Sequence, residues 1–177
     1  MSKAQRQEIT LRQATIADCL AVARVHVQSW RESFTGTVPQ TFLDRMSVVR
    51  RAKAFEKGFA SDVYQMFVAE TRENGIVGFA DFGKMRDNDG AYEAELYAIY
   101  LLHDFQRQGI GAKLFDLGVK YLIANGMNSM SLLALEASPY KSFYEKMGGC
   151  IVGRKTVVLD GVEYAGLVYG WDSLVES

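Results

Sequence analysis

The residues with the clearest capacity for chemistry form a glycine-rich stretch at positions 106–111, Gln-Arg-Gln-Gly-Ile-Gly. When such a stretch joins a strand to a helix, consecutive backbone N–H groups can converge on a phosphate, and the helix N-terminus adds positive potential. Gly109 and Gly111 allow close approach because they carry no side chain, and Arg107 and Lys113 could add cations. The pattern therefore indicates a phosphate-binding turn, although a plain tight turn would contain the same glycines.

Two common phosphate-binding motifs do not fit this stretch. A dinucleotide fingerprint requires glycine at the position of Leu114, and a P-loop requires Gly-Lys followed by Ser or Thr. The glycines must therefore serve a different kind of phosphate ligand, or only a turn.

The elements that must position this turn are a strand before it and a helix after it. Alternating residues predict a strand over Glu95–Leu101, and an apolar stripe at spacings of four, three and four predicts a helix from Gly109 to about Asn125. Before this region, periodicity and turn residues predict a strand at Ile9, a helix ending near Trp30, helices starting near Pro39 and Ser47, and strands at Tyr64–Thr71 and Ile76–Met85. After it, they predict a strand at Ser129–Leu135, a short helix at Pro139–Met147, and a hairpin of Cys150–Leu159 and Val162–Trp171.

This order, β-α-α-β-β-β-α-β-α-β-β, predicts an α/β (α+β) fold. Its sheet is mixed and largely antiparallel, with about seven strands and helices on both faces. The 177 residues, about half of them apolar, predict one domain over 1–177 with its core at about 9–171.

Charge and cysteine usage exclude several classes of protein. A net charge of -1 gives no electrostatic case for nucleic acid or an anionic membrane. Cys19 and Cys150 have no metal-ligand spacing, so we expect no metal site and no disulfide framework. The polar start of the chain and the lack of a long apolar run favour a cytoplasmic protein.

Two segments resemble one known family. Glu95–Leu114 resembles the signature of the GNAT superfamily of N-acetyltransferases, which is an apolar strand, then Gln/Arg-x-x-Gly-x-Gly/Ala, then an amphipathic helix. Ser138–Gly148, with its run Phe-Tyr-Glu-Lys-Met-Gly, resembles the closing segment of that family. The element order is similar over almost the whole chain. The resemblance implies an enzyme that moves an acetyl group from acetyl-CoA to a primary amine, without a metal.

The same resemblance implies how coenzyme A would be held. The pyrophosphate would meet the main-chain N–H groups of the glycine-rich turn, and the pantetheine arm would lie between two splayed strands, Glu95–Leu101 and Ser129–Leu135. The family often has an Asn near the start of the closing helix that forms a hydrogen bond with the pantetheine arm. In this chain Ser138 must make that hydrogen bond, or the hydrogen bond is missing. The implied cofactor-binding residues are Ile99, Leu101, Gln106, Arg107, Gln108, Gly109, Ile110, Gly111, Ala112, Ser138 and Tyr144.

Acetyl transfer needs a neutral amine, a polarised thioester carbonyl and a proton for the departing thiolate. Tyr144 is the implied general acid, and Glu95 the candidate base, acting directly or through a water. Strand alternation predicts Glu95, Tyr97, Ile99 and Leu101 on one face. The alternative to a catalytic role is a core tyrosine for Tyr144 and an exposed carboxylate at the sheet edge for Glu95.

The acceptor pocket is predicted from aromatic residues. His26 and Trp30 share a helix face, and with Arg31, Phe34 and Tyr97 they could line a pocket, although plain helix packing would use the first two equally well. The helix lacks an acidic or basic run, which favours a small and at most weakly charged acceptor. Still open are a non-catalytic CoA sensor, a peptide or protein acceptor, longer acyl chains and a homodimer; the presence of Tyr144 argues against the sensor.

Overall fold

The computed structural model describes residues 8–61, 63–86 and 90–175. The strands are β1 (Ile9–Gln13), β2 (Tyr64–Thr71), β3 (Gly75–Lys84), β4 (Ala94–Leu101), β5 (Met130–Leu135), β6 (Cys150–Leu159) and β7 (Val162–Trp171). The α-helices are α1 (Cys19–Phe34), α2 (Gln40–Arg45), α3 (Val48–Gly58), α4 (Ile110–Ala124) and α5 (Lys141–Lys146). Single 3-10 turns at Ile16–Asp18 and His103–Phe105 precede α1 and α4.

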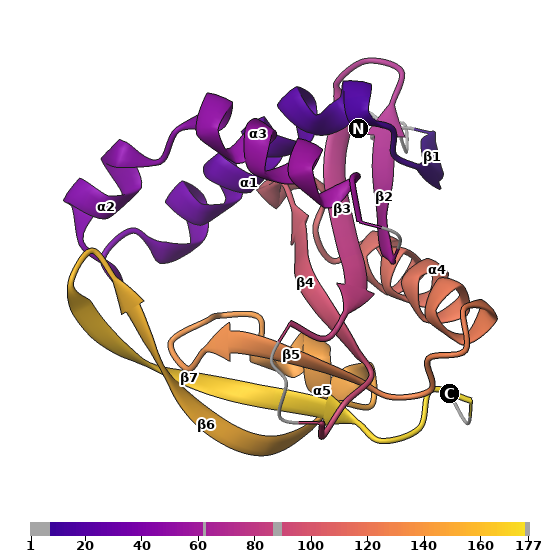
Figure 1. The fold of residues 1–177 in the computed structure, drawn as a ribbon. Coiled ribbons are helices and arrows are strands. Elements are labelled where there is room, and N and C mark those ends of the chain that lie inside the picture. Colours follow the sequence, from indigo (N-terminus) through magenta and orange to yellow (C-terminus); the bar gives the residue numbers. More distant parts are fainter. Residues whose placement is uncertain (1–7, 62, 87–89, 176–177) are drawn as a thin grey trace, which may run out of the picture.

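The predicted fold class is confirmed. The seven strands form one sheet in the order β1-β2-β3-β4-β5-β7-β6, and every neighbouring pair is antiparallel except β4 and β5 (Figure 1). The helices expected near Pro39 and Ser47 are both present after α1, so the described residues between the first two strands contain three helices, one more than the written order of elements counts. The additional one is the short α2, which follows Pro39, whose ring fixes φ near the helical value.

Helices cover both faces of the sheet (Figure 1). The helix α4 packs on β2, β3 and β4 from one side, over a core that includes Phe82, Leu96 and Leu114. On the other side α1 contacts α3, β3 and β4 over a second core that includes Val22, Phe55 and Phe79. Burial of these apolar side chains fixes both layers against β4, the strand that precedes the glycine-rich turn.

The β6–β7 hairpin reaches from the sheet to the helical layer (Figure 1). Its turn contains Asp160 at φ 54° and Gly161 at φ 78°, the positive values that a two-residue hairpin turn of this kind requires. Near its tip, Arg45 of α2 forms an ion pair with Asp160, and Leu159 belongs to a small core that also includes Phe42. The hairpin and α2 therefore close one side of the molecule together.

The expected alternation along β4 is wrong at one position. Ala98 pairs with Asp81 and Leu96 pairs with Phe82, so Tyr97 is an extra residue without a partner on β3. Such a bulge shifts the side-chain alternation by one residue.

The bulge separates residues that were expected on one face. Ile99 and Leu101 pack with the core beneath α4, whereas Ala98 and Tyr100 pack with the core beneath α1 and α3. Tyr97 stacks with Tyr64, a residue of that second core, with ring centroids 6.1 Å apart. Tyr97 therefore lies on the α1–α3 side, opposite to the side chains of Ile99 and Leu101.

Candidate active site

The centre of the sheet opens between β4 and β5. These parallel strands pair only at Ala94 with Met130 and at Glu95 with Ser131, and beyond these positions they diverge. The Leu102 N–H donates to Val77 of β3 at 2.9 Å, so by alternation the backbone groups of Leu101 point away from β3 and into the gap. The predicted splay is present, and the backbone of β4 that faces the gap beyond Glu95 is not paired with another strand.

A cleft of about 460 Å³ occupies the gap on the side of the glycine-rich turn. Residues of β4, of the turn, of α4 and of the segment 139–147 form its walls. They are Ile99, Tyr100, Leu101, Gln106, Arg107, Gly109, Gly111, Ala112, Pro139, Tyr140, Ser142, Phe143, Tyr144, Lys146 and Met147.

The glycine-rich turn has the geometry of an anion site. Gly109 has φ 80° at the N-cap of α4, and Arg107 also has a positive φ of 57°. The amides of residues 109–112 find no partner among the described residues, as expected for the first turn of a helix. A Cβ on Gly111 would lie 3.3 Å from the Phe143 ring, so glycine keeps the helix close to the wall of the cleft. These free donors fit a diphosphate.

Gln106 supports the cleft with its side chain. Its Nε2 donates to the Leu101 carbonyl at 3.0 Å and to the Tyr140 hydroxyl at 3.1 Å. The Tyr140 hydroxyl also lies 2.5 Å from Ser33 Oγ of α1. This network ties the turn, the end of β4 and the helical layer together at the mouth of the gap.

Most of the cofactor residues inferred from the sequence line this cleft, but three do not. Gln108 is exposed and its side chain donates to the Asp104 carbonyl at 2.9 Å. Ile110 is buried in the core, where its side chain anchors α4. Ser138 lines a neighbouring pocket instead, and its Oγ accepts from the Tyr140 N–H at 3.3 Å.

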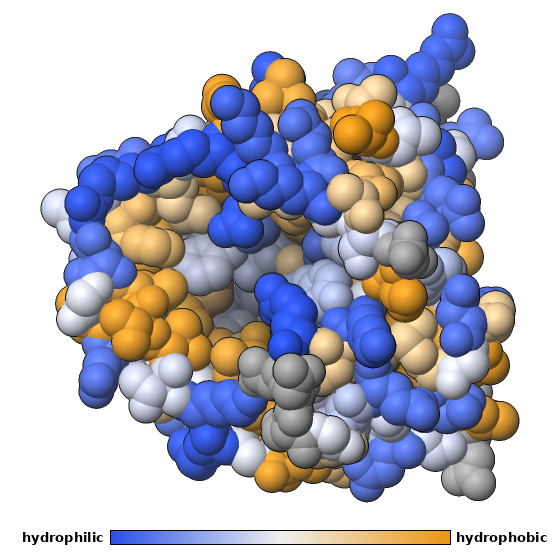
Figure 2. All heavy atoms as spheres, in the orientation of Figure 1, coloured by the Kyte–Doolittle hydropathy of each residue, from blue (hydrophilic) through white to orange (hydrophobic). Residues whose placement is uncertain are grey.

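That neighbouring pocket, of about 140 Å³, opens on the opposite side of the gap. It contains the three residues expected to bind the acceptor, Trp30, Phe34 and Tyr97. Figure 2 shows the hollow in which it lies, between the α1–α3 layer above and the lower strands β5–β7, with hydrophilic residues along the upper rim. Its complete lining is Trp30, Phe34, Tyr97, Ala98, Ile99, Tyr100, Leu132, Leu133, Ala134, Leu135, Ser138, Tyr140, Tyr144 and Val157.

The cleft and the pocket share a wall made of Ile99, Tyr100, Tyr140 and Tyr144. Tyr144 is 7% exposed and packs against Phe143 and Tyr169, with centroids 5.7 and 5.2 Å away. Its hydroxyl makes no hydrogen bond to another described residue, and burial raises its pKa well above the ordinary value for tyrosine. It is therefore a protonated phenol, free to donate, between two cavities.

Glu95 lies beside the pocket, not in its lining. Arg86 Nε donates to Glu95 Oε2 at 2.9 Å, and its Nη2 donates to Oε1 at 2.5 Å. The same guanidinium stands 4.4 Å from the centroid of the Tyr97 ring. Arg86 thus joins the expected base to the acceptor pocket, a contact that no sequence pattern indicated.

Two other residues of α1 differ from their expected role. Arg31 donates to the carbonyls of Leu43 and Met46, at 3.3 and 3.4 Å, and so fastens α2 to α1. His26 is buried among aromatic rings, and burial lowers its pKa to about 3, with the charge of Arg51 acting in the same direction. Neither residue lines the acceptor pocket.

Sequence reasoning missed Tyr100 and Tyr140, which belong to the shared wall. The bulge at Tyr97 was the obstacle for Tyr100, because strict alternation assigned it to the other face. Tyr140 could have been found from its spacing, since it lies four residues before Tyr144.

Neither Cys19 nor Cys150 lines the cleft or the pocket, and burial raises the pKa of Cys19 to about 11. Across residues 8–61, 63–86 and 90–175, no group of three or more His, Cys, Asp or Glu side chains is placed to hold a metal ion. Within the same ranges, no helix has the length and apolarity needed to cross a membrane.

Several known proteins are similar to this chain in sequence or in architecture. A model of the acetyltransferase (GNAT) domain matches residues 62–148. YuaI, an uncharacterised N-acetyltransferase of Bacillus subtilis, is 34% identical over 167 residues, which are 94% of each chain. Among solved structures, the fold is similar to that of YncA from Salmonella typhimurium, solved with its cofactor acetyl-CoA, with a TM-score of 0.72, 21% identity and 94% of both chains covered.

A second solved structure has the same fold. PaiA N-acetyltransferase from Thermoplasma acidophilum, in complex with coenzyme A, has a TM-score of 0.66 at 19% identity, covering 90% of this chain and 98% of that one. The family model covers β4, the glycine-rich turn and α5, which together form the cleft. The chain therefore belongs to the GNAT superfamily of N-acetyltransferases, enzymes that take their acetyl group from acetyl-CoA.

Proposed function

We propose that this enzyme transfers the acetyl group directly to a primary amine of a small acceptor, while acetyl-CoA and acceptor are bound together. The observation that carries the proposal is the shared wall: the cleft on one side of the gap and the pocket on the other meet at Tyr144. An amine in the pocket can therefore reach a thioester in the cleft without first acetylating the protein. The position of both cysteines outside these cavities supports the same route.

The residues present fit coenzyme A. The free amides of residues 109–112 suit its diphosphate, and Arg107 adds a cation at the edge of the cleft. The backbone groups of Ile99 and Leu101, which point into the gap, suit the amides of the pantetheine arm. The Leu101 N–H can also donate to the carbonyl oxygen of the acetyl group, where negative charge develops during transfer.

The bound thioester supplies the acetyl group: an N–C bond forms to the amine as the C–S bond breaks. Tyr144 donates its phenolic proton to the departing sulfur, which its hydroxyl can do because no other described residue holds it. Glu95 takes the proton that the amine loses. Because the carboxylate is bound to Arg86 and does not line the pocket, we propose that a water carries this proton.

Thiol release from acetyl-CoA, measured against a panel of diverse amines, tests the proposal. The expected result is acceptor-dependent release, with initial-velocity lines that intersect when both substrates are varied. An intact-mass spectrum taken without acceptor should show no acetylated protein. Parallel lines together with an acetylated cysteine would instead establish a covalent route and overturn direct transfer.

A further inference from the structure

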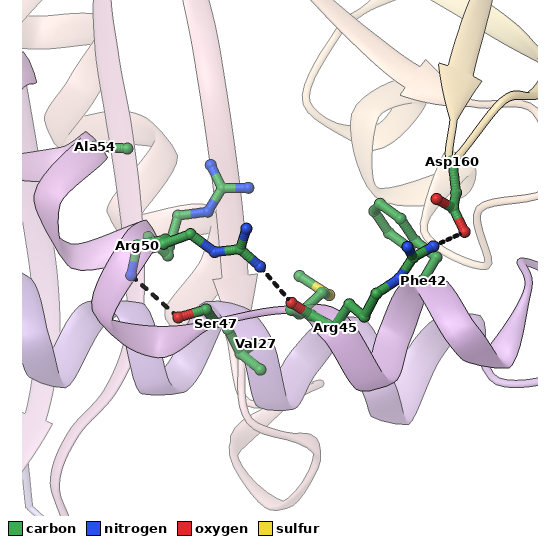
Figure 3. Close-up of a pocket in the computed structure, with 9 residues that line it drawn as sticks. Val27, Phe42, Arg45, Ser47, Arg50, Ala54 and Asp160 are labelled. Atoms are coloured by element: carbon green, nitrogen blue, oxygen red, sulfur yellow. Dashed lines mark hydrogen bonds and ion pairs between the residues drawn. The ribbon is translucent and has the colours of Figure 1, made fainter.

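A third cavity, of about 550 Å³, lies outside the cleft and the acceptor pocket, and Figure 3 shows the side chains that line it. Its walls come from α1, from α2 with the residue after it, from α3 with its N-cap, and from the turn of the β6–β7 hairpin. The lining residues are Val27, Phe42, Arg45, Met46, Ser47, Arg50, Arg51, Ala54 and Asp160.

Positive charge dominates this cavity, because three arginines face one carboxylate. Arg45 is already paired with Asp160. Arg50 Nη2 donates to the Arg45 carbonyl at 2.8 Å, and the guanidinium of Arg51 lies 5.8 Å from the Phe55 ring centroid. Neither Arg50 nor Arg51 has a carboxylate partner in the described part of the chain. Two guanidinium groups therefore line the cavity without a counter-ion.

The backbone around the two arginines is well fixed. Ser47 caps α3 by accepting a hydrogen bond from the Arg50 N–H at 3.2 Å, as Figure 3 shows. Arg31 of α1 holds the end of α2 through the carbonyls of Leu43 and Met46. The backbone that carries the two arginines is therefore held by the N-cap of α3 and by the contact of α1 with the end of α2.

The basic cavity and the acceptor pocket are separated by an aromatic wall. Phe42 lines the cavity, and its ring centroid is 5.7 Å from that of Trp30, which lines the pocket. Burial raises the pKa of Tyr100 to about 12, and the charge of Arg51 acts in the opposite direction. Arg51 is therefore within electrostatic range of the wall that the pocket shares with the cofactor cleft.

Two buried side-chain nitrogens lie in the same region. Nδ1 of His26 and the indole nitrogen of Trp30 make no hydrogen bond of normal geometry to a described residue, although the Trp30 side chain lies close enough to Tyr100 to lower the pKa of that hydroxyl. Trp30 lines the pocket, so its N–H can donate to an oxygen of a bound acceptor. The Trp30 N–H and the two unpaired guanidinium groups therefore both favour an acceptor that carries oxygen anions.

We infer that the acceptor is a primary amine bearing a carboxylate, phosphate or phosphonate, and that Arg50 and Arg51 bind this anionic group. Guanidinium groups bind both kinds of oxyanion through paired hydrogen bonds. In this arrangement the amine enters the narrow pocket. The apolar linker between the amine and the anionic group then lies along the rings of Trp30 and Phe42. This inference rests on the proposed function and replaces the weakly charged acceptor expected from the sequence of α1.

The test compares four amines of equal length: aminopentanoate, aminobutylphosphonate, pentylamine and diaminopentane. The expected kcat/KM is at least about tenfold higher for one of the two anionic amines than for pentylamine, because hydrogen bonds to charged groups are strong. The preferred anion then distinguishes a carboxylate from a phosphonate acceptor. Equal or better turnover of pentylamine or diaminopentane would overturn the inference while leaving acetyl transfer to amines intact.

Arginine variants connect the preference to the cavity. Arg51→Gln and the double variant with Arg50→Gln should lose about ten- to a hundredfold in kcat/KM for the anionic amine. Arg51→Glu should shift the preference toward diaminopentane. Lys53→Gln is the matched control, because Lys53 is exposed on the same helix and does not line the cavity. An anion preference that survives the double variant would refute the assignment of the site.

Different results would refute the proposed function and the anionic acceptor. If no amine of the wider panel releases thiol from an enzyme that binds acetyl-CoA, the proposed function is wrong, and the inference falls with it. If uncharged amines are acetylated and anionic ones are not, only the inference is wrong. Melting temperatures of all variants verify that each is folded.

Discussion

The guanidinium of Arg86 binds both carboxylate oxygens of Glu95, through Nε at 2.9 Å and Nη2 at 2.5 Å. Arg86 is the more exposed partner, with 64% of its side chain accessible against 9% for Glu95. The pair therefore joins a buried carboxylate to a largely exposed cation at the edge of the acceptor pocket. A base held in this way can take a proton only on a lone pair that Arg86 leaves free.

Replacement of Glu95 by Gln tests the base. The amide keeps the shape of the side chain but cannot accept the proton of the amine, so the rate should fall most below the pH at which the acceptor amine is already neutral. The measurement is a pH–rate profile of kcat/KM. Glu70→Gln is a suitable control because it weakens a carboxylate–arginine pair, with Arg12, on β2. A profile that matches the wild type would remove Glu95 from the mechanism.

Replacement of Tyr144 by Phe tests the acid. General acids contribute roughly a hundred- to ten-thousand-fold, and the effect should appear in kcat with little change in acetyl-CoA affinity. The ring contacts with Phe143 and Tyr169 survive the change, so the melting temperature should hold. A loss of less than about threefold, well below that range, would make Tyr144 a core residue only.

Tyr169→Phe is the matched control for this experiment. Tyr169 is also buried, and its hydroxyl also lacks a partner among the described residues, but it lines neither the cleft nor the pocket. Removing its hydroxyl should therefore leave kcat unchanged. Equal losses of kcat in the two variants would indicate disturbed packing instead of a lost proton donor.

Substitution at Gly111 tests the phosphate-binding turn. Gly111→Glu places a side chain and a negative charge beside the free amides of residues 109–112, so acetyl-CoA affinity should fall at least about tenfold. Gly111→Ala is the control, because its Cβ needs only a small shift of the Phe143 ring, 3.3 Å away. Calorimetry on both folded variants gives the affinities. Unchanged affinity of the glutamate variant would reject this turn as the site.

Asp81 should make stability depend on pH. Burial raises its pKa from 3.8 to about 7, while the Tyr64 hydroxyl and the charges of Arg86 and Arg51 act in the opposite direction. Between about pH 4 and 7 the folded protein therefore binds more protons at Asp81 than the unfolded chain does. Its contribution to the free energy of unfolding then falls as pH rises through this window.

Asp81→Asn removes this dependence. The variant should be more stable than the wild type near pH 8, by at most about 4 kcal/mol, and the difference should vanish toward pH 4. Urea denaturation across this range provides the measurement, with the exposed residue Asp116 changed to Asn as the control. A constant difference at every pH would contradict the assignment of a raised pKa to Asp81.

Local patterns in the chain were sufficient to predict most of the elements and many of the residues that line the cleft. The bounds of β2, β6 and β7 match the prediction, because their turn residues and alternation act over a few neighbours. The glycines of residues 106–111 indicated a phosphate-binding turn for the same reason, since φ at Gly109 and the free amides depend on local backbone alone. The contiguous motif of the closing segment similarly pointed to Tyr144, which lines both the cleft and the pocket.

Contacts between distant segments determined which residues lie in and around the proposed acceptor pocket. The bulge at Tyr97 depends on the register of β4 against β3, and the pair of Glu95 with Arg86 depends on which face that bulge presents. Arg50 and Arg51 meet the turn at Asp160 only because the β6–β7 hairpin reaches α2. The periodicity of a single segment does not indicate which distant segments it will contact. Register and packing depend on the burial of many side chains at once.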